Sequence, residues 1–213
     1  MTVLLGGAGF FWTGSKLGWL VAMALGALYL FRLKWPVKSK IAALAFITIF
    51  GLGIFAVRFH HYFAAGATSV SARFDYWRAA LQTTETHPLT GTGPGTFQRP
   101  YAQIKSPAAE MARLVHNDYL EQFSDSGVPG GVFYGAWIMM ALATVGRRVW
   151  KTENQIQFAI FIGLLGWFFQ GIGEFGLYIP ALAWTAFTLL GCLLALTEIG
   201  STNLRQPASL PTR

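Results

Sequence analysis

Long apolar runs constrain the fold of this chain more than any other feature of its sequence. Five runs are predicted to be membrane-spanning α-helices, because each approaches the roughly 20 residues that a helix needs to cross a bilayer. They cover residues 17–33, 41–59, 129–145, 156–175 and 179–196. Charged residues make up only 12% of the chain, about half the share found in soluble domains. The sequence therefore predicts an all-α, polytopic helical membrane protein.

The distribution of charge predicts how these helices are oriented. The short connections and the C-terminal tail hold nine Lys and Arg residues against two acidic residues, Glu153 and Glu198. The one long connection, residues 60–128, holds five basic and six acidic residues. By the positive-inside rule, the short connections and the tail face the cytoplasm and the long loop faces outward. This topology accounts for the formal net charge of +7, so no nucleic-acid partner is predicted.

The predicted spans divide the chain into four parts. Residues 1–59 form an N-terminal stub and two transmembrane helices, 60–128 an extracytoplasmic loop, 129–196 three further transmembrane helices, and 197–213 a disordered cytoplasmic tail. The first apolar stretch, residues 3–12, is too short to cross a bilayer. We therefore expect the chain to be the C-terminal part of a longer protein.

The long loop is predicted to be partly helical. Apolar residues recur at helical spacing in residues 71–82, which indicates an amphipathic helix against the membrane face. The His-Pro pair at 87–88 is expected to stop this helix. A second helix is predicted over about residues 108–124, ending at Ser126 and Gly127, because glycine suits the position just past a helix end.

Two polar features of the loop are candidate binding elements. Gly91, Gly93 and Gly95 force a tight turn whose backbone amides can converge on an anion, although such a turn is far more often only structural. Arg73 and Arg78 lie on the first loop helix, where they can bind an anionic substrate or simply contact lipid headgroups. No spacing of His, Cys, Asp and Glu resembles a zinc or calcium site, so neither a metal nor another cofactor is expected.

Four motifs follow one another along the loop. The first is Arg73-x3-Trp77. The others are His-Pro-Leu-x-Gly-x-Gly-Pro-Gly-x-Phe at 87–97, His-Asn-Asp-Tyr-Leu-Glu at 116–121 and Gly-x-x-Gly at 127–130. In this order they resemble the O-antigen ligase and Wzy-type polymerase superfamily, which includes related protein O-glycan transferases. The resemblance runs from about residue 13 to the end of the final helix and is strongest across these motifs.

The resemblance implies a glycan transferase in the bacterial inner membrane, with several passes and its long loop outside the cytoplasm. Members of the superfamily move a glycan from an undecaprenyl-diphosphate carrier to an acceptor hydroxyl and are similar to metal-independent inverting glycosyltransferases. The implied acceptor is a glycan, lipid A-core or a protein. Ligases, polymerases and protein-glycosylating members share these motifs, so the motifs do not choose among them.

The resemblance also assigns roles to individual residues. His116 corresponds to the general base, a role that suits an imidazole because its pKa lies near working pH, although a lone histidine is more often structural. Arg73 corresponds to the arginine that binds the diphosphate through paired hydrogen bonds. Lys16 stands where the family has an arginine, so it keeps the charge but loses the forked geometry. The further expected substrate-binding residues are Lys16, Arg78, Gly93, Gly95, Asn117 and Glu174.

Three hypotheses about function stay open on the sequence. The first is a glycan transferase of the O-antigen ligase type. The second is a non-catalytic or truncated remnant of that family, which the short first stretch and Lys16 favour. The third is a small transporter subunit, which would require polar residues at mid-span, where this sequence has almost none.

Overall fold

The computed structural model describes residues 2–107 and 109–203 and shows an all-helical chain, as the sequence predicts. No strand occurs in that part of the chain. In chain order the helices are α1 (Thr2–Trp12), α2 (Lys16–Arg32), α3 (Val37–Ala64), α4 (Thr68–Thr86), α5 (Gln98–Ile104), α6 (Asp118–Val149), α7 (Gln155–Gln170), the short 3-10 helix η1 (Gly176–Tyr178) and α8 (Pro180–Asn203).

Three of these helices, α3, α6 and α8, are long and apolar enough to cross a membrane. Each of the five predicted spans overlaps a helix, but the fourth, 156–175, is wrong at its end, because α7 stops at Gln170. α2 has 17 residues and α7 has 16, so the count of five crossings stays a prediction. The chain is a helical membrane protein. The most apolar stretch of α3 has no buried residue, which suits a surface in contact with lipid.

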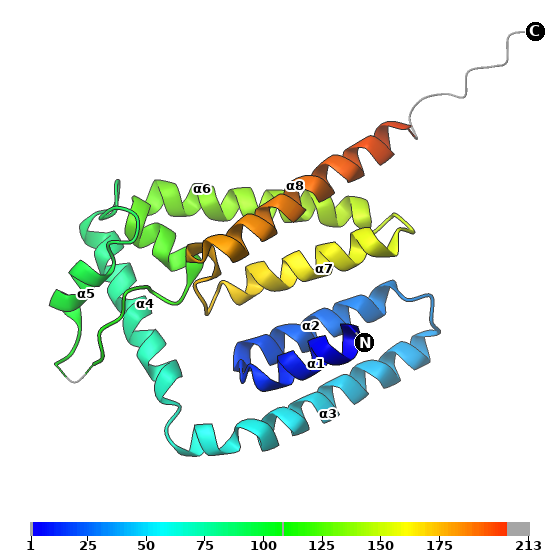
Figure 1. The fold of residues 1–213 in the computed structure, drawn as a ribbon, viewed down its shortest axis with the longest axis horizontal. Coiled ribbons are helices and arrows are strands. Elements are labelled where there is room, and N and C mark those ends of the chain that lie inside the picture. Colours follow the sequence, from blue (N-terminus) through cyan, green and yellow to red (C-terminus); the bar gives the residue numbers. More distant parts are fainter. Residues whose placement is uncertain (1, 108, 204–213) are drawn as a thin grey trace, which may run out of the picture.

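The helices form two groups (Figure 1). α6, α7 and α8 pack on one another around a buried core that includes Val145, Phe158 and Leu190. α1, α2 and α3 lie beside this group, and α2 packs against both α3 and α7. α4 lies across one end of the bundle and packs against α5 and α6. The predicted loop is therefore a helical cap on the bundle.

Two features of this cap agree with the sequence and one does not. The predicted first loop helix and its stop are confirmed, because α4 covers it and His87 is its C-terminal cap. The predicted second helix is wrong over residues 109–117, which are not helical. The physical reason is local: His116 has a φ of 56°, which a right-handed helix excludes, and Asn117 instead caps the start of α6.

The helix end predicted at Ser126 and Gly127 is confirmed, because Gly127 is a non-helical kink between two helical stretches of α6. Its φ is 69°, and a Cβ atom there would lie 2.6 Å from the backbone carbonyl carbon of Leu89. Pro129 follows within the first turn after the kink, where a missing backbone N–H is tolerated. The loop segment around Pro88 therefore packs directly on the α6 backbone, and the Val128 N–H donates to the Pro88 carbonyl at 2.7 Å.

The last helix extends beyond its predicted end. α8 continues through Asn203, seven residues past position 196, and the Thr197 hydroxyl donates back to the Leu193 carbonyl at 2.8 Å within it. The remainder of the predicted tail, residues 204–213, lies outside the described residues.

Candidate functional site

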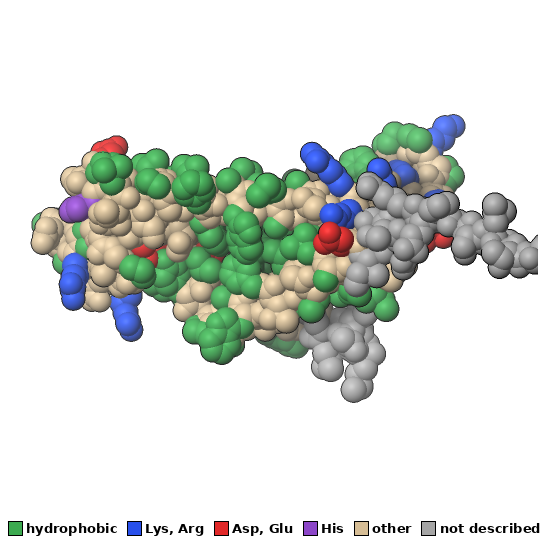
Figure 2. All heavy atoms as spheres, turned by 90° about the horizontal axis from the view of Figure 1, so that it is seen from above, with side chains coloured by type: hydrophobic (Ala, Val, Ile, Leu, Met, Phe, Trp, Pro, Cys, Tyr) green, Lys and Arg blue, Asp and Glu red, His purple; other side chains and the backbone are tan. Residues whose placement is uncertain are grey.

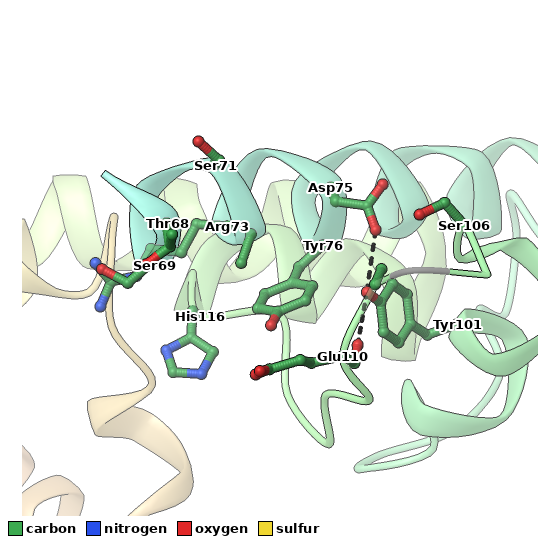
Figure 3. Close-up of a pocket in the computed structure, with 12 residues that line it drawn as sticks. Thr68, Ser69, Ser71, Arg73, Asp75, Tyr76, Tyr101, Ser106, Glu110 and His116 are labelled. Atoms are coloured by element: carbon green, nitrogen blue, oxygen red, sulfur yellow. Dashed lines mark hydrogen bonds between the residues drawn. The ribbon is translucent and has the colours of Figure 1, made fainter. Parts of the chain in front are cut away.

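A cavity of about 560 Å³ lies between α4 and the non-helical residues 105–107 and 109–117. α4 supplies Arg73, Asp75 and Tyr76, and the segment opposite supplies Glu110 and His116. In Figure 3 the His116 ring, the Tyr76 ring and the Glu110 side chain point into the same space. The first and third sequence motifs therefore meet at one cavity.

Glu174 joins the two predicted catalytic residues. Its Oε1 accepts a hydrogen bond from Arg73 Nη2 at 2.8 Å, and its Oε2 lies 3.9 Å from His116 Nδ1. The second distance is too long for a hydrogen bond, and His116 Nδ1 is a buried atom with no hydrogen-bond partner among the described residues. Three distant segments thus converge: α4, the turn before α6, and the turn after α7.

Glu174 is held in its ionised form by this arrangement. Burial disfavours the charged carboxylate, but the interactions with His116 and Arg73 outweigh it and lower the pKa of Glu174 below its ordinary value. Both members of the Arg73–Glu174 pair are only partly exposed, at 24% and 32% of the side chain, so solvent screens them incompletely. The site therefore contains a fixed negative charge next to the histidine.

The orientation of His116 is fixed by its surroundings. Its backbone is in the left-handed region, and its carbonyl accepts a hydrogen bond from Trp77 Nε1 at 3.3 Å. Its ring packs edge-on against Phe175, with centroids 4.6 Å apart, and lies 5.9 Å from the Tyr76 ring. A left-handed backbone at a non-glycine residue is uncommon and requires surrounding contacts to hold it. The hydrogen bond from Trp77 is one such contact.

The other end of the cavity is acidic and aromatic. The Tyr101 hydroxyl lies between two acceptors, Asp75 Oδ2 at 3.0 Å and the Glu110 carbonyl oxygen at 3.1 Å. Tyr76 packs edge-on against Tyr101, with ring centroids 5.3 Å apart. Burial, followed by the hydrogen bond to Asp75, raises the pKa of Tyr101 far above its ordinary value, so this hydroxyl stays protonated. One end of the cavity therefore holds the Arg73–Glu174 pair and His116, and the other carries carboxylates and tyrosines.

Several predicted substrate-binding residues lie outside the cavity. Arg78 pairs with Asp75 at 2.7 Å and its side chain is 60% exposed, beside a separate hollow on the other face of α4. Lys16 places its ammonium 3.7 Å from the centroid of the Tyr62 ring, a cation–π contact. The Tyr62 hydroxyl in turn lies 2.6 Å from Ser69 Oγ, at the edge of the cavity. Lys16 is thus next to the site and Arg78 is directed away from it.

Asn117 acts as the N-terminal cap of α6. Its Oδ1 accepts hydrogen bonds from the backbone N–H groups of Tyr119 and Leu120, both at 3.0 Å, and the residue is buried. This satisfies two of the amides that a helix leaves unpaired at its start. A contact from Asn117 to substrate stays a prediction.

The glycine turn is fastened to α6 by its own amides. The Gly93 N–H donates to the Asp125 carbonyl and the Gly95 N–H to Asp125 Oδ2, both at 2.9 Å. A Cβ atom at Gly91 would lie 2.3 Å from the backbone carbon of Asp125, so only glycine allows this approach. The amides expected to bind an anion at Gly93 and Gly95 are therefore engaged within the chain.

Sequence reasoning missed a row of buried carboxylates on α6. Asp118 accepts the Leu177 N–H at 3.1 Å, Glu121 accepts the Val115 N–H at 3.1 Å, and Asp125 accepts the Tyr178 hydroxyl at 2.6 Å. Each bond fixes a segment next to the site. Their spacing of three and four residues places all three on one helix face and could have indicated this row. The charge balance of the long loop includes them but assigns them no structural role.

The fold and the site together define a helical membrane protein with a cavity of mixed charge. A family model described as O-antigen ligase matches residues 1–135, more than half of the chain, including Arg73 and His116. The chain belongs to the O-antigen ligase family, as the motifs predicted. No curated protein and no solved structure gives a significant match. Membership indicates an O-antigen ligase-like function in surface polysaccharide synthesis.

Proposed function

We propose that this protein transfers a glycan from an undecaprenyl-diphosphate carrier to an acceptor hydroxyl, with His116 as general base and Arg73 as ligand of the diphosphate. The observation that carries the proposal is that both side chains line one cavity and approach the same carboxylate, Glu174. The reaction takes place on the outer side of the bacterial inner membrane, to which the positive-inside rule assigns the loop.

Glu174 prepares His116 for proton transfer. A carboxylate 3.9 Å from Nδ1 favours the tautomer that carries its proton on Nδ1, which leaves Nε2 free to accept a proton from the acceptor hydroxyl. The imidazolium that forms is then stabilised by the neighbouring negative charge. Catalytic hydrogen bonds are often long in an empty site and shorten when substrate binds, so the present distance fits this role.

Arg73 stabilises the leaving group. The acceptor oxygen attacks the anomeric carbon, the bond from that carbon to the phosphate oxygen breaks, and the hydroxyl proton passes to His116. Negative charge develops on the departing diphosphate, and the guanidinium can neutralise it through paired hydrogen bonds. The bond to Glu174 occupies Nη2, and the other N–H donors of the guanidinium suit phosphate oxygens.

The acidic and aromatic end of the cavity suits a hydroxyl-rich acceptor. Carboxylate oxygens of Asp75 and Glu110 can accept hydrogen bonds from sugar hydroxyls, and the rings of Tyr76 and Tyr101 offer flat apolar faces. The acceptor hydroxyl therefore lies between this end and His116. A glycan, lipid A-core or a protein each offers such a hydroxyl.

The test is complementation of a strain that lacks its own ligase or polymerase, read on a gel of surface glycans. His116→Ala and Arg73→Ala are expected to abolish transfer, while immunoblots show unchanged amounts in the membrane. The matched controls, His87→Ala and Arg99→Ala, remove the same residue types from exposed positions in the same loop and are expected to retain transfer. Normal transfer by His116→Ala would overturn the assignment of the base.

A further inference from the structure

The connections between α2 and α3 and between α6 and α7 lie at the end of the bundle opposite α4 (Figure 1). Two hollows at these connections share a wall. One, of about 450 Å³, is polar and includes Tyr29, Arg32, Lys34 and Glu153 together with Trp150 and Lys151. The other, of about 480 Å³, is lined by Leu28, Gly146, Phe161 and the side chain of Arg147, again with Trp150 and Lys151. Because two residues belong to both, the hollows are adjacent.

The polar hollow carries excess positive charge. Arg32 is held in place, since its guanidinium donates to the carbonyl oxygens of Val149, at 2.8 Å, and Thr152, and lies 4.0 Å from the centroid of the Phe158 ring. The single acidic residue in the lining, Glu153, pairs with Lys34 at 3.1 Å. Both side chains of that pair are about nine-tenths exposed, so the pair is weak and easily exchanged. Figure 2 shows Lys and Arg side chains gathered at this end.

We propose that the two hollows together bind one anionic phospholipid of the adjacent leaflet, with its phosphate in the polar hollow and an acyl chain in the apolar one. A headgroup phosphate matches Arg32, Lys34 and Lys151, and the apolar walls of Leu28 and Phe161 match a hydrocarbon chain. Trp150 stands at the junction of the two, and indole rings favour the boundary between headgroups and acyl chains. Neither hollow lies near the His116 cavity, so this site is independent of the proposed transfer reaction.

The location gives the lipid a structural effect that can be measured. The hollows are walled by the C-terminal end of α2, the C-terminal end of α6 and the start of α7. α2 is also the helix through which the first helical group packs against α7. A lipid that binds only the folded protein stabilises it by mass action. Binding here is therefore expected to raise the melting temperature of the purified chain.

The experiment measures lipid binding to the purified full chain in detergent by native mass spectrometry. Phosphatidylglycerol is expected to bind more tightly than phosphatidylcholine of the same acyl chains and to raise the melting temperature. Lys34→Gln and Lys151→Gln are each expected to weaken phosphatidylglycerol binding about fivefold. Lys38→Gln removes an exposed cation of the same connection that lines neither hollow, and is expected to leave binding unchanged.

Two further ligands test the polar hollow and the apolar hollow separately. Dihexanoyl phosphatidylglycerol, whose chains are short, is expected to bind more weakly than the long-chain lipid because it fills less of the apolar hollow. Glycerophosphoglycerol, which has no acyl chains, reports phosphate recognition alone. Equal binding of phosphatidylcholine, equal loss in Lys38→Gln and Lys151→Gln, or no loss in the double variant Lys34→Gln/Lys151→Gln would each overturn the proposal.

Discussion

Replacing Glu174 by glutamine tests the charge relation at the centre of the site. The substitution keeps the shape and size of the side chain but removes the negative charge that faces His116 and Arg73. At 3.9 Å, two unit charges attract by ~1 kcal/mol in water and by ~4 kcal/mol at an effective dielectric constant of 20. Because the two side chains are about one-third exposed, we expect a value between these limits.

The corresponding loss in transfer rate is between about fivefold and about seven-hundredfold, since each ~1.4 kcal/mol of lost transition-state stabilisation lowers a rate tenfold. The assay is initial-rate glycan transfer in membranes that contain matched amounts of protein. Glu174→Asp restores the charge at a greater distance and should recover part of the rate. Glu85→Gln removes an exposed carboxylate from α4 outside the cavity and serves as the matched control.

A Glu174→Gln rate equal to that of the unmodified protein would refute the reasoning, because it would show that the carboxylate contributes nothing to proton transfer or to the position of Arg73. A lower rate accompanied by a lower melting temperature would show loss of folding instead. The Arg73–Glu174 pair is partly exposed, and such pairs contribute about 1 kcal/mol or less to stability. We therefore expect the melting temperature to change little.

Further predictions concern the stability of the fold and whether Asn117 only caps α6 or also binds substrate. Gly127→Ala should lower the free energy of unfolding by at least ~2 kcal/mol because its Cβ would collide with the Leu89 backbone at a positive φ; Gly135→Ala, with no atom within 4 Å, should leave the melting temperature unchanged. Asn117→Ala should lower stability by about 1 kcal/mol through loss of the cap. Asn117→Asp should retain both melting temperature and transfer, and loss of transfer alone would indicate a substrate contact. The lowered pKa of Glu174 stabilises the fold above the ordinary carboxyl pKa of about 4.3. This contribution is lost as pH falls through the lowered pKa. The difference in melting temperature between Glu174→Gln and the unmodified protein should therefore be smaller at low pH than at neutral pH.

The helices were predictable from sequence because their signals are local. Apolar runs and the His-Pro pair act within a few residues, and the structure reproduces them in α3, α4 and α8. The segment before α6 was not predictable in the same way. Its composition permits a helix, but the backbone of His116 is held in the left-handed region by Trp77, which lies 39 residues earlier. A tertiary contact of that kind has no local signature.

The candidate site also combines features with a local sequence signal and features that arise only from tertiary contacts. α-Helical rotation is about 100° per residue, so Arg78 lies roughly 140° around α4 from Arg73, although both were predicted to bind substrate. In contrast, the convergence of Arg73 and His116 on Glu174 joins residues up to 101 positions apart. The order of the family motifs implied that Arg73 and His116 act together. The helical periodicity of the chain did not indicate that these two residues act together.

The buried carboxylates of α6 explain why the loop motifs indicate the family when they occur together but not when they occur singly. Asp125 holds the glycine turn, and Glu121 holds the backbone of Val115, the residue before His116. Asp118 accepts the Leu177 N–H and donates its own N–H to the Gly171 carbonyl, on both sides of Glu174. One helix face thus positions three loop segments, each through a hydrogen bond to a buried carboxyl group. A glycine turn or a lone histidine elsewhere lacks this support. The catalytic geometry proposed for Arg73 and His116 therefore depends on α6 as much as on the residues that line the cavity.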